Sequence, residues 1–344
     1  MSRWFMLLAL IVALVVSIPS RCPAPLVYRP GEGWSYEPVG GNKWERTRAS
    51  DQMEVAETAF AQKDFFVAQK AAKRVVRHWP LSDYAPRAQY LLARCLEERR
   101  MDERAFKQYQ LLLEKYPKYE GYNEVMERQL MIANRFLAGQ WFKLWGYIPI
   151  GPSMDRTAKL YEKIVQKAPY HDTIGPEAQM SIGKARENQK SYLKAAEAYT
   201  KAADRYSDRP RVAAEALWQA GEANRMQSAE AEYDQGAAVR AIETYNDFIS
   251  LFPEDSRIPQ ARENIIEMRT EQARGSFIVA KFYEKYHRYQ SAVIYYNEVL
   301  IKDPDSPYAP KARERLEVLK KRIAEREAAK EKAEAEKARK ALEK

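Results

Sequence analysis

Cysteine and histidine, the residues most used for redox chemistry and zinc binding, are scarce in this chain. Its 344 residues include two cysteines and three histidines. Cys22 and Cys95 lie far apart, and nothing in the sequence supports a disulfide between them. His78, His171 and His287 each fall near an expected helix end, and no two have the spacing of zinc ligands. Phosphate-binding glycine loops, dinucleotide fingerprints and nucleophile elbows are also missing. We therefore expect no enzyme, no metal and no cofactor.

Signals for β-structure are equally scarce. No alternating apolar and polar run and no Asn-Gly or Asp-Gly turn marks a hairpin. Alanine, leucine, glutamate, lysine and arginine dominate, and glycine is sparse after residue 50. This composition indicates a helical protein.

One spacing recurs six times along the chain. A small residue is followed four positions later by an aromatic or small one, and a helix-ending position follows eight residues after that. The sets are Ala68/Ala72/Pro80, Ala105/Tyr109/Pro117, Thr157/Tyr161/Pro169, Ala195/Tyr199/Ser207, Ala241/Tyr245/Pro253 and Ala292/Tyr296/Pro304. The pattern matches the second half of a tetratricopeptide repeat. It predicts an all-α, tetratricopeptide-like right-handed solenoid of about six helix pairs over residues 50–304. A plain amphipathic bundle is the alternative, which six equal spacings disfavour.

The first helix of each expected pair is also visible. Its apolar stripe in the second repeat is Ala88, Leu91, Leu92, Cys95 and Leu96. In the fourth repeat, Gly183 marks the expected closest approach of two backbones.

Extra residues separate some repeats. Residues 139–152, rich in tryptophan and tyrosine, predict a loop or short lid. Residues 227–236 predict a polar extension between helices. A continuous helical pattern spans about 259–286.

Both ends of the chain differ from the repeats. Arg3 precedes an apolar run over residues 4–18, which predicts a signal peptide over 1–21; an uncleaved anchor is the alternative. Cys22 then invites lipidation, although the residues before it are not those usual in lipoprotein signals. Residues 22–49 predict an extended linker. The alternative is that its aromatic side chains dock on the repeats or on a partner. Residues 305–344 predict a charged, solvated helix or tail, and binding to anionic lipid or to a partner helix is the alternative.

The formal charge of +9 raises nucleic-acid binding as an option. Because the chain carries an export signal and its basic surplus is dispersed or in the tail, we expect no nucleic acid.

Two stretches carry a family resemblance: WPLSDYAPRAQYLLARC (79–95) and VAKFYEKYHRYQSAVIYYNEVLIKDPDSPYAPKARERL (279–316). With the export signal and the cysteine after it, the chain resembles the BamD-type outer-membrane assembly lipoproteins. The resemblance covers roughly residues 50–320. It departs from the family in its residues before Cys22, its sixth repeat and its charged tail. The resemblance implies a membrane-attached accessory of β-barrel assembly on the periplasmic face of the outer membrane. Its partners would be the assembly barrel and unfolded barrel substrates.

The first two repeats suggest a peptide-binding groove. Polar and aromatic residues lie opposite the apolar stripes of the first helices: Met53, Glu57, Phe60, Arg87, Tyr90 and Arg94. Arginine suits a terminal carboxylate and aromatic rings suit an aromatic side chain, as at the ends of barrel substrates. A solvated face without ligand is the alternative. The alternative function is a general envelope scaffold for peptidoglycan or polysaccharide export machinery.

Overall fold

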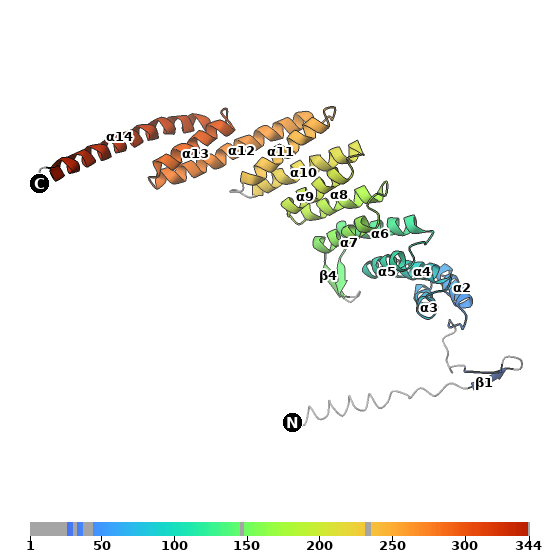
Figure 1. Cartoon of the computed structure of the whole chain (residues 1–344). Helices are drawn as coiled ribbons and strands as arrows, with labels where there is room; N and C mark the ends of the chain where they lie inside the picture. The colour runs from blue at the N-terminus through green and yellow to red at the C-terminus, as the bar shows by residue number, and fades with distance from the viewer. Residues whose placement is uncertain (1–25, 30–32, 37–43, 145–147, 231–234, 343–344) are drawn as a thin grey trace, which may run out of the picture. The chain divides into compact units, whose positions relative to one another are not determined.

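Figure 1 shows a computed structural model of the chain, which describes residues 26–29, 33–36, 44–144, 148–230 and 235–342. The predicted signal segment and Cys22 lie outside these residues. Thirteen helices occupy most of the described part. The chain divides into two compact units, residues 1–120 and 121–344.

The first unit contains two helix pairs and a short ribbon. Its helices are α2 (Ala49–Ala61), α3 (Phe65–His78), α4 (Ala85–Glu98) and α5 (Asp102–Lys115). Each packs against the next along the chain, and α2 also contacts α4. Strands β1 (Leu26–Arg29) and β2 (Gly33–Tyr36) pair antiparallel within the predicted linker. The end of the linker is fixed to α2, because buried Gln52 accepts from the backbone N–H of Arg46 at 2.8 Å and donates to the carbonyl of Trp44 at 2.9 Å.

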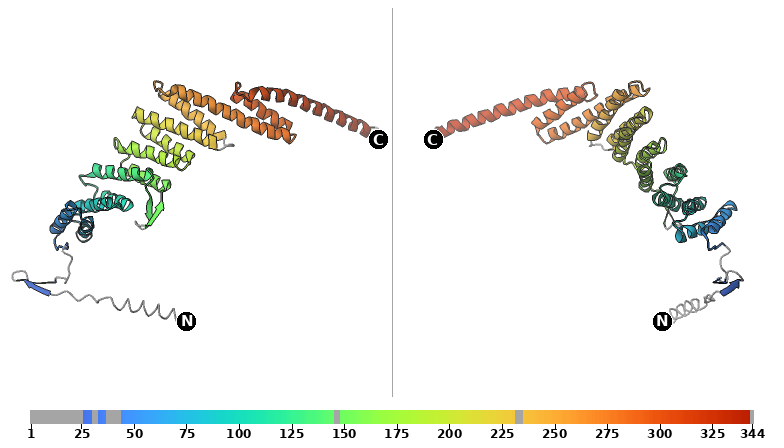
Figure 2. Two further views of the ribbon diagram at one scale, coloured as in Figure 1. Left: turned by 180° about the vertical axis from the view of Figure 1, so that it is seen from behind. Right: turned by 45° about the vertical axis from the view of Figure 1, so that its right-hand side comes forward.

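The second unit continues the same plan, with successive helices side by side in both views of Figure 2. Its helices are α6 (Tyr122–Leu137), α7 (Met154–Lys167), α8 (Ile174–Glu187), α9 (Tyr192–Arg205), α10 (Pro210–Glu230), α11 (Gln235–Leu251), α12 (Ile258–Lys285), α13 (Tyr289–Lys302) and α14 (Ala309–Leu342). Helices end before Pro80, Pro117 and Pro253, as the sequence predicts, because proline cannot continue a helix. The long α12 confirms the continuous pattern over 259–286.

The recurring tyrosine has a polar function as well as a packing one. It is buried in the second helix of a pair, and in four repeats its hydroxyl donates to a carboxylate of the first helix. The pairs are Tyr109–Glu97 at 2.9 Å, Tyr199–Glu187 at 3.0 Å, Tyr245–Glu222 at 2.7 Å and Tyr296–Glu284 at 2.8 Å. Satisfying the hydroxyl in this way avoids the cost of burying it unpaired.

Gly183 has a different purpose from the predicted one. A Cβ atom at this position would lie 2.4 Å from the Tyr199 ring. The glycine therefore makes room for that ring and not for a neighbouring backbone. Gly221 does the same for Tyr245, where the corresponding distance is 2.6 Å.

Two short strands lie where the sequence predicted a loop or lid over residues 139–152. Strands β3 (Phe142–Leu144) and β4 (Ile148–Gly151) pair antiparallel. The buried Phe142 ring stacks on Phe136 with centroids 4.1 Å apart, and the Arg156 guanidinium lies 4.3 Å from its centre. This anchor supplies the hydrophobic burial that such short strands cannot provide alone.

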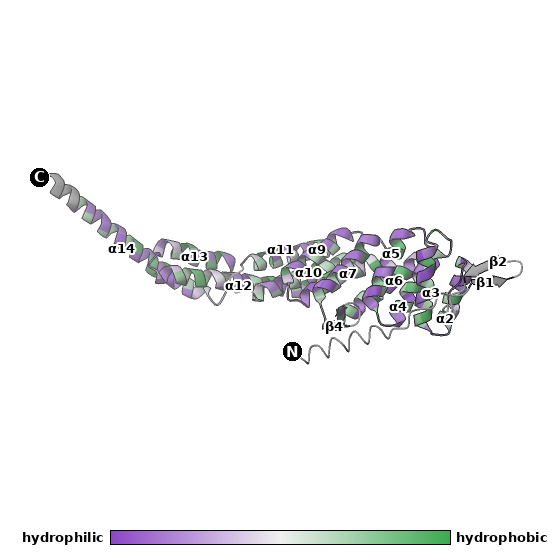
Figure 3. Cartoon of the chain, turned by 90° about the horizontal axis from the view of Figure 1, so that it is seen from below, coloured by the Kyte–Doolittle hydropathy of each residue, from purple (hydrophilic) through white to green (hydrophobic). Residues whose placement is uncertain are grey.

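The start of the predicted charged tail belongs to the core. Ala312, Leu316 and Leu319 of α14 are buried in one cluster with residues of α12 and α13. Side chains of α14 from 324 to 336 are exposed, and this stretch is largely hydrophilic in Figure 3.

Candidate functional site

Helix α4 presents two opposite faces to its surroundings in the first unit. Arg87, Tyr90 and Arg94 lie on one face, and Gln89 and Leu92 lie on the other, which follows from the 3.6-residue period. The first face carries the residues predicted from the sequence. The second lines a cavity that sequence reasoning missed.

The two predicted arginines differ in burial and partners. Arg87 extends into solvent, with 69% of its side chain exposed, and its Nε lies 2.7 Å from Glu57 Oε1. Arg94 is held more closely, with 20% of its side chain exposed. Its guanidinium donates to the Tyr90 hydroxyl at 3.3 Å and to Glu98 at 3.2 Å. An incoming carboxylate would therefore exchange with carboxylates already present.

Aromatic rings surround Arg94. The Phe60 ring centre lies 5.5 Å from its guanidinium carbon, within range of a cation–π interaction. Tyr90 stacks on Tyr119 with centroids 6.0 Å apart and lies 6.1 Å from Tyr109. The structure thus brings Phe60, Tyr90 and Arg94 together in one cluster.

Met53 is not part of that surface. Only 2% of it is exposed, because it points into the core between helices. Its predicted place in the groove is therefore wrong. The aromatic–arginine face, as the structure has it, consists of Glu57, Phe60, Arg87, Tyr90 and Arg94.

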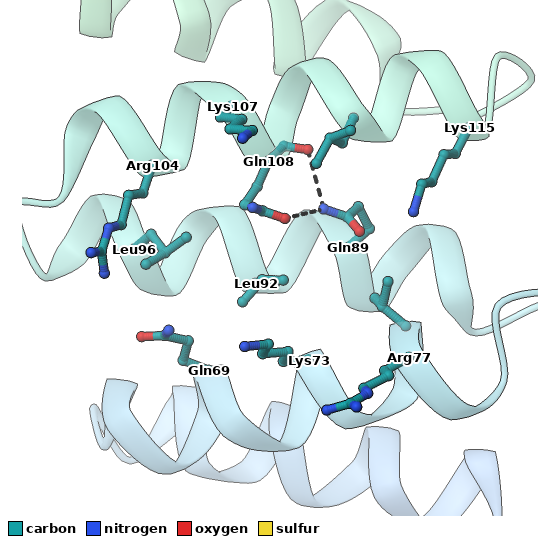
Figure 4. Close-up of a pocket in the computed structure, with 12 residues that line it drawn as sticks. Gln69, Lys73, Arg77, Gln89, Leu92, Leu96, Arg104, Lys107, Gln108 and Lys115 are labelled. Carbon is teal, nitrogen blue, oxygen red and sulfur yellow. Dashed lines mark hydrogen bonds between the residues drawn. The ribbon is translucent and has the colours of Figure 1, made fainter. Parts of the chain in front are cut away.

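A cavity of about 530 Å³ lies on the other face of α4, between α3 and α5 (Figure 4). We call it the basic groove. Its lining residues are Gln69, Lys73, Val76 and Arg77 of α3, Gln89, Leu92 and Leu96 of α4, and Arg104, Lys107, Gln108, Leu111 and Lys115 of α5. We call α4 the floor of the groove and α3 and α5 its two banks. The buried Gln89 of α4 donates to the side-chain oxygen of Gln108 at 2.7 Å and to its backbone carbonyl at 3.3 Å. These hydrogen bonds connect the floor to the α5 bank.

Sequence reasoning treated the lysines and arginines of this groove as ordinary solvated charge. Their gathering depends on two helices that are separated by α4 in the sequence. One signal was available: Lys73 and Arg77 occupy fixed positions after Ala68, and Lys107 and Lys115 occupy fixed positions after Ala105. Aligning the repeats on the small residue would have shown glutamate at the Lys73 position of the third repeat and at the Lys107 position of the fourth.

No group of metal-ligating side chains gathers within the described part of the chain. None of the described helices is long and apolar enough to cross a membrane. Cys95 is a free, buried thiol on α4, and burial raises its pKa to about 12. The lipidation predicted at Cys22 concerns a residue outside the described structure.

Comparison with protein families places this architecture among known repeat proteins. Residues 87–119, which span α4 and α5, match the tetratricopeptide repeat family. Residues 173–303, from α8 to α13, match the family YfiO, described as outer membrane lipoproteins.

The chain therefore carries a YfiO-type segment. YfiO proteins are the BamD-type lipoproteins that the sequence resembles, so that prediction is confirmed. The all-α tetratricopeptide fold is confirmed as well. The match of this segment to an outer membrane lipoprotein family implies a place in the cell envelope.

Solved structures of tetratricopeptide proteins also match at low identity. The C-terminal part of a repeat protein from Cytophaga hutchinsonii is 15% identical, with 78% of this chain and 88% of that chain covered and a TM-score of 0.34. A repeat protein from Parabacteroides merdae is 13% identical, with coverages of 79% and 98% and a TM-score of 0.32. PilF of Pseudomonas aeruginosa is 11% identical, with coverages of 78% and 97% and a TM-score of 0.26. A search of curated proteins found no significant match.

Proposed function

We propose that the protein is a non-catalytic scaffold of outer-membrane β-barrel assembly, attached to the membrane through its N-terminus. The observation that carries this proposal is the YfiO-type segment over residues 173–303. In this proposal the segment docks on the assembly barrel. The first unit meets unfolded barrel substrates at the periplasmic face of the outer membrane.

The aromatic–arginine face is the proposed substrate contact. A substrate chain ending in an aromatic residue brings one ring and one free carboxylate. The Phe60 and Tyr90 rings offer surface for the former, and the Arg94 guanidinium suits the latter through charge-assisted hydrogen bonds. Because Glu57 and Glu98 already pair with the arginines, binding would be an exchange of carboxylates. This favours reversible contacts, which a passing substrate requires.

Site-specific crosslinking in cells tests both contacts. A photoreactive amino acid would replace Phe60 on the substrate face or the exposed Ile294 within the YfiO-type segment. The control position is Leu81, which is 97% exposed and outside both surfaces.

We expect unfolded barrel proteins crosslinked at Phe60 and the assembly barrel crosslinked at Ile294, with neither at Leu81. Recovery of peptidoglycan or polysaccharide export components in their place would contradict the proposal and support a general envelope scaffold.

A further inference from the structure

The basic groove has a counterpart in the second unit, in the same register of the repeat. That counterpart is a cavity of about 370 Å³ between α7, α8 and α9. Gln179 occupies the position of Gln89, sixteen residues before the small residue of its repeat. It also donates to a backbone carbonyl nineteen residues ahead, Ala198, at 3.1 Å. The two cavities are therefore two copies of one architectural feature.

The copies differ in charge. Five basic residues and no acidic residue line the basic groove. Its counterpart is lined by four basic and two acidic residues. Glu162 stands where the basic groove has Lys73, and Glu197 stands where it has Lys107. The repeat fold thus accepts glutamate at both positions.

Pairing within the two copies differs as well. In the counterpart, Arg186 contacts Asp155 at 2.7 Å and Glu162 at 3.5 Å, and Arg205 donates to Gln179 at 3.2 Å. In the basic groove, four cations form no ion pair with any other residue of the described ranges: Lys73, Arg77, Lys107 and Lys115. The counterpart is partly neutralised by its own carboxylates, whereas the basic groove has unmatched positive charge on both banks.

The floor between the banks is apolar. Leu92 and Leu96 of α4 lie at its base (Figure 4). Val76 of α3 and Leu111 of α5 also line the cavity. A ligand with anionic groups alone would leave the apolar floor in contact with water. A ligand with apolar groups alone would leave the lysines and arginines without ion-pair partners. The complementary ligand carries apolar side chains flanked by carboxylates.

We propose that the basic groove is a second protein-binding site, which takes an acidic peptide segment with an apolar side chain between its carboxylates. The segment lies along α4, with its apolar side chain on Leu92 and Leu96. Its carboxylates contact Lys73 and Arg77 on one bank and Lys107 and Lys115 on the other. This surface lies on the face of α4 opposite Arg94, so the two sites accept different ligands.

Fluorescence anisotropy with the full-length chain in zwitterionic lipid nanodiscs tests the proposal. The probe is a dye-labelled peptide with a central leucine between glutamates and aspartates, and its control is the same peptide with glutamine and asparagine. We expect saturable binding of the acidic probe, weakening as salt rises because the contacts are partly exposed. The neutral probe should bind at least tenfold more weakly.

Two variants test the lining, and the first takes its residues from the counterpart cavity. Lys73→Glu with Lys107→Glu should weaken the acidic probe at least tenfold, since attraction becomes repulsion on both banks. Leu111→Gln should weaken binding of the acidic probe severalfold, because it removes apolar surface from the groove and changes no charge. The matched control, Lys118→Glu with Lys163→Glu, makes the same change of net charge at exposed positions outside the groove and should leave binding unchanged. Circular dichroism verifies that each variant is folded.

Equal affinity for the two probes, or an unaltered Kd in the Lys73/Lys107 variant, would overturn the proposal. Displacement of the probe by phosphatidylglycerol vesicles, with vesicle binding lost in that variant, would assign the groove to anionic lipid instead. Binding of aromatic-ended peptides at Arg94 should be unaffected by any groove variant. That readout separates failure of this inference from failure of the proposed function.

Discussion

The aromatic–arginine face makes a graded prediction, because its two arginines differ in burial. In full-length protein, Arg94→Ala should weaken binding of a peptide ending in phenylalanine with a free carboxylate far more than Arg87→Ala does. Arg94 has 20% of its side chain exposed and lies against the Phe60 ring. Arg87 has 69% of its side chain exposed and pairs with Glu57.

The magnitudes follow from solvent screening. A hydrogen bond to a charged group that is partly desolvated contributes about 1.5–3 kcal/mol, which corresponds to roughly 10- to 150-fold in Kd for Arg94→Ala. An exposed ion pair contributes about 0.2–1 kcal/mol, which corresponds to less than about sixfold for Arg87→Ala. Glu98 competes with the peptide carboxylate for Arg94, so we expect the loss of affinity in Arg94→Ala to lie near the lower end of this range.

Fluorescence titration with acid and amide forms of the peptide measures both effects. Amidation removes the carboxylate, so it should weaken binding to the wild-type protein and have little further effect on the Arg94→Ala variant. Such non-additivity would identify Arg94 as the partner of the terminal carboxylate. The matched control is Arg128→Ala, because Arg128 on α6 is also 20% exposed and pairs with a glutamate four residues away.

Equal affinity for the acid and amide peptides would refute the reasoning. So would an Arg87→Ala effect as large as that of Arg94→Ala, because exposure would then not determine the strength of the contact.

Three further predictions concern the fold. Gly183→Ala should lower the free energy of unfolding by about 1–3 kcal/mol in denaturant titration, since its Cβ would overlap the Tyr199 ring; a loss below experimental error would contradict this. The buried Cys95 thiol, whose pKa is raised to about 12, should react with iodoacetamide at pH 8 only after denaturation, as peptide mass spectrometry would show; rapid labelling of native protein would exclude the buried site. Hydrogen bonds from Lys159 and Arg186 lower the pKa of Asp155 from 3.8 to about 2, so its stabilisation is present above about pH 4 and is lost as pH falls towards 2. Asp155→Asn should therefore reduce the slope of stability against pH over that interval, by less than about 1 kcal/mol because the side chain is half exposed; an unchanged slope would show that the pairing contributes nothing.

The sequence predicted most of the repeat fold because the repeat is a local pattern. The spacing from Ala195 through Tyr199 to Ser207 fits within one helix and its end, so helical period and helix-stop residues suffice to detect it. The apolar stripe of α4 was equally visible, and its residues, Cys95 included, are buried as expected. Phe60, Tyr90 and Arg94 were predicted to share a surface, and the structure brings them together.

Other features depended on contacts that no local pattern contains. The β3–β4 hairpin relies on burial of Phe142 against Phe136, a contact across a turn between a helix and a strand. Met53 and Gly183 were assigned correctly to helices, but their surroundings are set by neighbouring elements. For Gly183, the neighbour is the Tyr199 ring.

By itself, the sequence determined the helix pairs, their order and most of the residues that face inward, because hydrophobic period and proline positions act within each helix. Only the tertiary structure decided which charges meet. It distinguished the exposed Arg87 from the enclosed Arg94. It also brought Lys73 of α3 and Lys107 of α5 to the same cavity. The physical reason is that burial and electrostatic pairing depend on distances between helices, and the packing of side chains fixes those distances only when the helices come together.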